Sequence, residues 1–151
     1  MQDEWVDRMR AAVPSTSSWR SFYSSLAGGI VTDSALMLLP IDDHMVHRGH
    51  AVFDTCNVHN DRAYGLHFHL DRLLKSAATA RIEHSYTKEA LRDIILVTIA
   101  AGGRSKKGAD AFAKFWLSAG RQAESYFHYS SLAKTLASAD CQRATSHRSH
   151  Y

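Results

Sequence analysis

The sequence has little cysteine, little proline and no long hydrophobic run, and these shortages exclude several classes of protein. It contains two cysteines and two prolines in 151 residues. Cys56 and Cys141 lie far apart, which argues against a disulfide framework and indicates a reducing, intracellular compartment. The longest apolar run, residues 35–40, is far too short to cross a membrane. The first residues are unlike a signal peptide or an arginine-rich transit peptide.

Net charge is also low, at +3, and residues 121–151 supply most of it. A protein that binds nucleic acid presents a dense basic face on its folded part. No such concentration of lysine and arginine occurs before residue 121. We therefore expect no nucleic-acid partner.

Composition divides the chain into three parts. Residues 1–18 form an N-terminal extension, in which residues 1–12 suit a short amphipathic helix and Pro14 with the following serines suits a linker. Residues 19–120 form the body. All eight glycines lie before residue 121, and residues 121–151 are rich in serine with only a weak apolar pattern. This last part is expected to be a disordered tail.

Several short segments of the body favour strands. Residues 30–31 and 35–39 suggest a hairpin around a Thr32-Asp33-Ser34 turn. Residues 51–58 are rich in β-branched and aromatic side chains, and a turn after them leads into a short strand at 62–66. Residues 111–120 form another strand rich in aromatic residues.

Two segments between these strands have helical periodicity. In residues 67–82, apolar side chains recur at steps of three and four, as in Leu70, Leu73 and Ala77. A second helix is expected after Thr87, a suitable N-cap, and ends before Gly102. The body is therefore predicted to be an α+β domain, with a small antiparallel or mixed sheet and two main helices.

Three histidines at three-residue spacing, His44, His47 and His50, are metal ligands by type. On a strand or loop, however, this spacing alternates faces, so surface or hydrogen-bonding histidines are the favoured interpretation and no metal site is predicted. The HFHLD segment has the HxHxD spacing of binuclear metal hydrolases. It begins a helix whose apolar stripe continues for three turns, so we attribute this spacing to chance. The sequence also lacks the GxSxG elbow of serine hydrolases and the Walker phosphate loop.

Arg72 stands out among the leucines of the first predicted helix, on a stripe shared with His69 and Ser76. A guanidinium in this position can turn inward and hold an anion through two parallel hydrogen bonds. The alternative is an exposed arginine with a buried stem. Spacing alone leaves both open.

Three motifs together resemble the N-terminal half of fold-type IV pyridoxal-phosphate enzymes: PIDDHMVHRGHAVFDT, then HLDRLLKSA, then FWLSAG. These enzymes include D-amino-acid aminotransferases, branched-chain aminotransferases and aminodeoxychorismate lyase. The resemblance is strongest to the plant D-amino-acid and branched-chain aminotransferase-like group, and it covers residues 22–120. It implies a small domain that lies over pyridoxal 5′-phosphate in a homodimer acting on amino acids and 2-oxo acids.

The resemblance also implies roles for individual residues. Arg72, the arginine of HLDR, falls where the family binds the cofactor phosphate. Phe53 falls at the aromatic that lines the substrate pocket, and Arg48 at a position that faces the pocket or the dimer partner. Three further residues fall where members contact the substrate carboxylate: Trp116, Ser118 and Arg121.

The resemblance assigns no catalytic residue to this chain. Family members carry the Schiff-base lysine in a second domain, and no lysine here lies in a segment that resembles it. Transamination depends on that lysine. We therefore expect a truncated product of such a gene, inactive as an isolated chain. The alternative is a non-catalytic module that dimerises or associates with a full-length relative.

Overall fold

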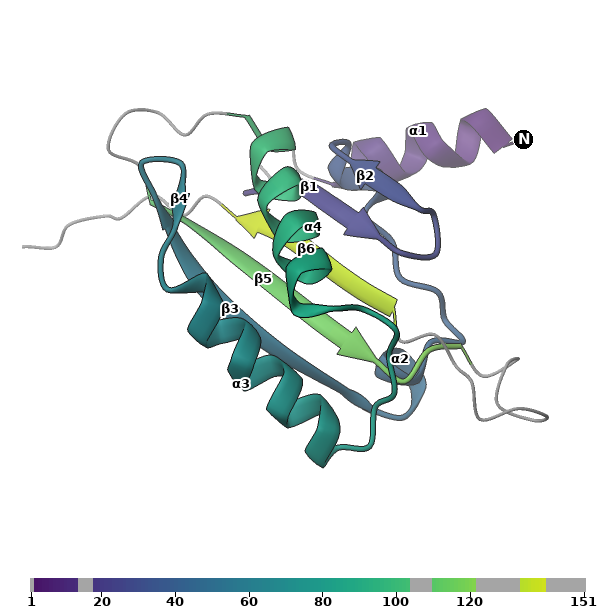
Figure 1. Cartoon of the computed structure of the whole chain (residues 1–151). Coiled ribbons are helices and arrows are strands. Elements are labelled where there is room, and N and C mark those ends of the chain that lie inside the picture. The colour runs from purple at the N-terminus through teal and green to yellow at the C-terminus, as the bar shows by residue number, and fades with distance from the viewer. Residues whose placement is uncertain (1, 14–17, 104–109, 122–133, 141–151) are drawn as a thin grey trace, which may run out of the picture.

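A six-stranded antiparallel sheet with two helices on one face forms the body of the protein (Figure 1). The structure, a computed structural model, describes residues 2–13, 18–103, 110–121 and 134–140. The strand order is β2-β1-β6-β5-β3-β4. The strands are β1 (Trp19–Ser24), β2 (Gly29–Val31), β3 (Ala51–His59), β4 (Arg62–Ala63), β5 (Ala111–Ser118) and β6 (Lys134–Asp140). The predicted α+β class is confirmed.

The two main helices are α3 (Leu66–Thr79) and α4 (Lys88–Ala101), where periodicity predicted them. The hydroxyl of Thr87 caps α4 by accepting a hydrogen bond from the backbone N–H of Ala90 at 3.1 Å. Gly65 precedes α3 with a φ of 60°, a left-handed conformation that glycine adopts without strain. α3 packs over β3, and α4 over β6 and β1. Among the described residues, no helix is long and apolar enough to span a membrane.

The core lies between these helices and the sheet. β3 shows how the two faces of the sheet differ, because its side chains alternate. Asp54, Cys56 and Val58 are buried beneath the helices, whereas Phe53 and Asn57 are exposed on the other face. The largest apolar side chains of the core are Leu70 and Leu73 of α3, Leu91 and Ile95 of α4, and Phe115 and Leu117 of β5.

The predicted hairpin of residues 30–31 and 35–39 is wrong. Residues 30–31 lie in β2, but β2 pairs with β1, and Ser34–Leu36 forms the 3-10 helix η1. The cause is local, since the Asp33 carboxylate accepts a hydrogen bond from the backbone N–H of Ala35 at 3.1 Å and so starts a helical turn. The N-terminal helix α1 (Gln2–Ala12) is present as predicted, and Arg10 pairs with Asp33 at 2.9 Å.

The predicted disorder of residues 121–151 is wrong for residues 134–140. They form β6, which pairs with β1 on one side and with β5 on the other. Both neighbours would otherwise present unpaired backbone groups, and this demand outweighs the weak apolar pattern of the segment. The rest of the predicted tail after residue 121 lies outside the described residues. The other domain boundaries stay predictions.

Candidate cofactor and substrate site

Arg72 holds a carboxylate through two parallel hydrogen bonds, and that carboxylate belongs to the protein itself. Nε of Arg72 donates to Oδ2 of Asp54 at 2.6 Å, and Nη2 donates to Oδ1 at 2.5 Å. The Asp54 side chain is 2% exposed, whereas that of Arg72 is 68% exposed. Arg72 thus combines both predicted alternatives, because it grips an anion inward and keeps its outer edge in solvent.

His69 completes this cluster from one turn earlier on α3. Its Nδ1 lies 3.0 Å from Oδ1 of Asp54 and 3.3 Å from Nη2 of Arg72. Burial raises the pKa of Asp54, but hydrogen bonds from Arg72, His69 and the backbone of Thr55 outweigh it and bring the pKa to about 2. The same carboxylate raises the pKa of Arg72. The cluster therefore holds an ionised pair at ordinary pH.

Phe53 and Trp116 lie directly opposite each other on β3 and β5, on the face of the sheet away from α3. Phe53 is 62% exposed. The ammonium group of Lys114 sits 5.0 Å from the centre of the Phe53 ring and 5.4 Å from that of Trp116. Two of the predicted substrate residues are thus brought together, beside a cation that the sequence did not single out.

Ser118 is placed differently, although it ends the same strand. It is 1% exposed, and its hydroxyl donates to the buried carboxylate of Asp43 at 3.0 Å and accepts from the backbone N–H of Gly120. Arg121 pairs with Asp42 through Nε at 2.7 Å and Nη2 at 2.6 Å. Both predicted substrate residues are therefore engaged with the segment that precedes Arg48, and their predicted role stays untested.

The three histidines of this segment gather, in contrast to the expectation from their spacing. The chain forms a one-turn helix, α2 (His44–His47), and Gly49 then bends it back with a φ of 65°. The His44 ring centre lies 5.1 Å from that of His47 and 6.2 Å from that of His50. Burial, with the nearby charge of Arg48, lowers the pKa of His44. Among the described residues, no group of three ligands is suited to a metal ion.

Arg48 ends α2 with an exposed side chain, and its backbone N–H donates to the carbonyl of His44 at 3.0 Å. The glycine after it supplies the bend that the next strand needs. Arg48 is therefore presented to solvent from the turn between α2 and β3, a few residues before Phe53.

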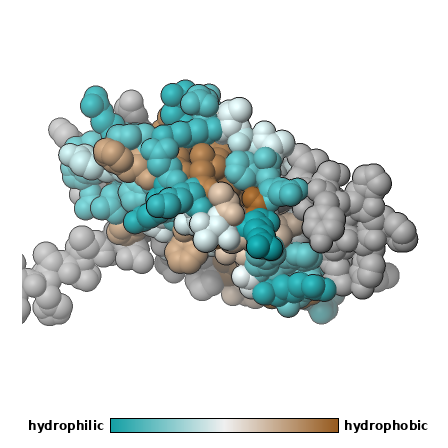
Figure 2. Space-filling view, turned by 60° about the horizontal axis from the view of Figure 1, so that its bottom comes forward, coloured by the Kyte–Doolittle hydropathy of each residue, from teal (hydrophilic) through white to brown (hydrophobic). Residues whose placement is uncertain are grey.

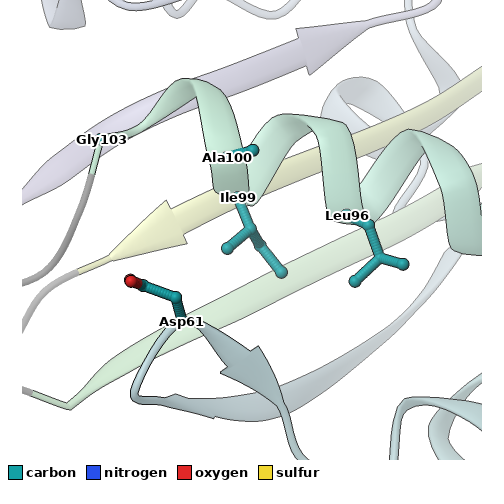
Figure 3. A pocket seen from close by; sticks show the side chains of 5 residues that line it. All are labelled: Asp61, Leu96, Ile99, Ala100 and Gly103. Carbon is teal, nitrogen blue, oxygen red and sulfur yellow. The ribbon is translucent and has the colours of Figure 1, made fainter.

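A pocket of about 310 Å³ lies elsewhere, at the end of α4. Leu96 and Ile99 project from α4 toward the β3–β4 turn that carries Asp61 (Figure 3). Its lining contains none of the predicted site residues. This pocket is separate from the cluster around Arg72.

Asp54 belongs to this candidate site, although the sequence motifs did not single it out. It is the first of the three buried positions of β3, before Cys56 and Val58, and a charged side chain at such a position needs a partner. Arg72 and His69 supply these partners from α3, the helix that packs on β3. An inward carboxylate on a strand, with an arginine inside the adjoining helix, was the signal available.

Known proteins share both the sequence pattern and this architecture. The pattern of the family described as amino-transferase class IV matches residues 51–148, more than half of the chain. The chain belongs to the class IV amino-transferase family. This match extends beyond residue 120, where the motifs of the sequence analysis end.

Individual relatives of this class IV chain agree with the assignment. It is 46% identical over 100 residues to the chloroplastic D-amino-acid transaminase of Arabidopsis thaliana, an alignment covering 66% of the chain and 26% of the relative. The fold IV transaminase CpuTA1 of Curtobacterium pusillum superposes with a TM-score of 0.68 at 23% identity, covering 84% of this chain and 44% of that one. The fold-type IV assignment from the sequence is thereby confirmed.

A pyridoxal-phosphate-bound structure of a hypothetical aminotransferase from Mycobacterium tuberculosis gives a TM-score of 0.67 at 23% identity. The match covers 82% of this chain and 40% of that one. The class IV chain thus spans about a quarter of the curated relative and less than half of each solved structure.

Proposed function

We propose that this chain forms part of a pyridoxal-phosphate-dependent aminotransferase that acts on amino acids and 2-oxo acids. The observation that carries the proposal is the placement of Arg72, whose exposed guanidinium is held against β3 by two hydrogen bonds to Asp54. The names of the relatives support it, since one is a D-amino-acid transaminase of Arabidopsis thaliana and another is a hypothetical aminotransferase of Mycobacterium tuberculosis in a pyridoxal-phosphate-bound form.

Arg72 suits the phosphate group of such a cofactor. Two of its three nitrogens donate to Asp54, while Nη1 has no partner within the part of the chain that the structure describes. With 68% of the side chain exposed, this outer edge is accessible to an anion. A phosphate monoester carries close to two negative charges and accepts such charge-assisted hydrogen bonds.

The other predicted residues suit a substrate with an apolar part and a carboxylate. Phe53 and Trp116 offer aromatic surface, which packs against a side chain and excludes water. Arg48 and Arg121 offer guanidinium groups that bind carboxylates, Arg121 after exchange of its partner Asp42. Ser118 acts through Asp43, by holding the segment that carries Arg48.

When bound, pyridoxal phosphate supplies the aldehyde and the electron-withdrawing ring on which amino-group transfer depends. The residues of this chain would supply binding and orientation: Arg72 would hold the phosphate on the α3 side of β3, and Phe53 and Trp116 offer aromatic surface on the opposite face of the sheet. We propose a second copy of the chain as its partner, as the resemblance implies.

Binding of the cofactor by the full chain tests this function. Wild-type protein should bind pyridoxal phosphate more tightly than pyridoxal, which lacks the phosphate, as measured by absorption and fluorescence titration. Arg72→Gln should remove most of this difference, about tenfold or more in affinity. Arg92→Gln is the matched control, because Arg92 is an exposed helix arginine on α4 that pairs with Asp93. Equal affinity of wild-type protein for both compounds would contradict the proposal.

Amino-group transfer needs a separate assay. Incubation with pyridoxal phosphate, an amino donor and a 2-oxo acid should be followed by a search for the new oxo acid, and borohydride reduction with mass spectrometry should locate any lysine bound to the cofactor. Binding without turnover would assign the chain the cofactor-binding part of the reaction alone.

A second candidate function is a non-catalytic module that dimerises or associates with a full-length relative. The observation that favours it is a run of exposed apolar side chains around α2: Leu36, Leu38, Leu39, Ile41 and Val46. On the face drawn in Figure 2, hydrophobic residues reach the surface between hydrophilic ones. Patches of this kind mark association surfaces. Sedimentation of the chain that shows self-association, without any cofactor binding, would favour this candidate.

A further inference from the structure

We propose that Asp54 is a positioning residue for phosphate recognition, which acts by holding Arg72 in one orientation, and that His69 supports this orientation. This inference rests on the proposed function and deepens it, because it adds to the site two residues that the resemblance did not single out. The ligand it concerns is a phosphate monoester.

The contacts between Asp54 and Arg72 determine which edge of the guanidinium is left for a ligand. Asp54 occupies Nε and Nη2 of Arg72, which form one edge of the planar guanidinium. The opposite edge, with Nη1, is then directed away from β3. Asp54 itself lies on a strand fixed by pairing with β5, where it faces Phe115, a fully buried side chain. The orientation of Arg72 is therefore set from a buried position in the paired β3 and β5 strands.

The contacts with Asp54 and His69 pre-organise Arg72, which lowers the conformational entropy cost of binding phosphate. A free arginine side chain samples many rotamers, and a ligand that binds it must immobilise it. Here folding has already restricted the side chain, so a phosphate meets a guanidinium in one orientation. His69, one turn earlier on the same helix, contacts both partners and limits rotation of the pair.

The negative charge of Asp54 repels an anion such as phosphate. The burial of this carboxylate explains why its contact with Arg72 still favours binding of phosphate. The carboxylate is 2% exposed and lies behind the guanidinium, whereas the guanidinium is 68% exposed. A phosphate in front of Arg72 is therefore closer to the positive charge than to the negative one. Water around the exposed edge also screens the more distant repulsion.

The test compares Asp54→Asn with Asp71→Asn in the full chain. Both variants remove one carboxylate, but Asp71 is the neighbour of Arg72 on α3 and pairs with Lys88 at the surface. The probes are pyridoxal phosphate and pyridoxal. We expect Asp54→Asn to weaken binding of pyridoxal phosphate by about tenfold and to leave pyridoxal unchanged, whereas Asp71→Asn should alter neither.

A double-mutant cycle shows whether Asp54 acts through Arg72. Once Arg72→Gln is present, adding Asp54→Asn should weaken binding of pyridoxal phosphate no further. If Arg72→Gln weakens binding and Asp54→Asn does not, the positioning role is wrong and the proposed function stands. If Arg72→Gln has no effect, the proposed phosphate site itself is wrong.

A second readout needs no ligand. In nuclear magnetic resonance spectra, the Nε–H group of Arg72 should be rigid and protected from exchange in the wild-type chain and in Asp71→Asn, and mobile in Asp54→Asn. If the Nε–H group is as mobile in wild-type protein as in Asp54→Asn, the positioning role of Asp54 is wrong, whichever ligand the chain binds. A folded Asp54→Asn variant, checked by its circular dichroism, keeps both readouts interpretable.

Discussion

The hydroxyl of Ser118 donates a hydrogen bond to the carboxylate of Asp43 at 3.0 Å, and this contact ties the end of β5 to the segment that starts α2. Asp43 is 2% exposed and also accepts from the backbone N–H of Met45 at 2.8 Å. A buried carboxylate with these two donors fixes the chain just before Arg48. The position of that arginine therefore depends on a contact between two residues that lie 75 positions apart in the sequence.

Ser118→Ala should destabilise the fold by about 1–3 kcal/mol, because it leaves the buried Asp43 carboxylate short of a donor. Urea unfolding followed by circular dichroism measures the change. Ser85→Ala, at an exposed loop position, is the control and should shift the free energy of unfolding by less than about 0.5 kcal/mol. Equal effects of the two substitutions would show that the contact contributes nothing.

Gly102→Ala should destabilise the protein by about 1–3 kcal/mol, although alanine normally suits the end of a helix. An added Cβ would lie 3.0 Å from Oγ of Ser21 and 3.2 Å from Cβ of Arg20. Ser21 cannot move aside freely, since its hydroxyl donates to the carbonyl of Thr98 at 2.6 Å. Gly29→Ala, whose Cβ would meet nothing nearer than 4.0 Å, is the control in the same thermal-melting assay. A higher melting temperature for Gly102→Ala would contradict the crowding argument.

The stability of the fold should fall in acid as Asp54 becomes protonated. Its pKa of about 2 lies below the ordinary value of 3.8, so the ionised group contributes its full stabilisation above about pH 4. That contribution, roughly 2 kcal/mol, is lost as the pH falls from about 4 toward 2. Unfolding free energies measured across this range for wild-type protein and Asp54→Asn should converge at the acid end. Parallel curves would show that Asp54 does not titrate with folding.

Leu70→Ala should cost about 2–5 kcal/mol, because Leu70 is 1% exposed and packs in the core between α3 and the sheet. Leu96→Ala offers the same chemical change on α4 at a side chain that is 41% exposed, and it should cost less than about 1 kcal/mol. Chemical denaturation of both variants checks the contrast. Similar losses would mean that the helix faces are assigned wrongly.

Much of the fold followed from local patterns in the sequence. The two main helices have strong periodicity, and Thr87 and Gly102 mark the ends of α4. β3 and β5 have the β-branched and aromatic residues that strands favour. Where prediction failed, long-range pairing decided the structure: β6 is a strand because β1 and β5 both need a partner, and no pattern within residues 134–140 records that need.

The candidate site divides in the same way. Arg72 was predicted from its neighbours and from the resemblance, but its pairing with Asp54 depends on the register of α3 over β3, which no single segment specifies. The approach of His47 and His50 to His44 depends on the bend at Gly49. Spacing along the chain therefore located the chemical groups, and tertiary packing determined their partners.

The place of β6 in the sheet has a consequence for how the chain folds during synthesis. β1 and β2 form one unit and β5, β3 and β4 another, and the strand that joins them is the last of the six to leave the ribosome. Until residues 134–140 emerge, both units carry an open edge that can pair with other chains. The nascent polypeptide is therefore most prone to aggregation shortly before its sheet is completed.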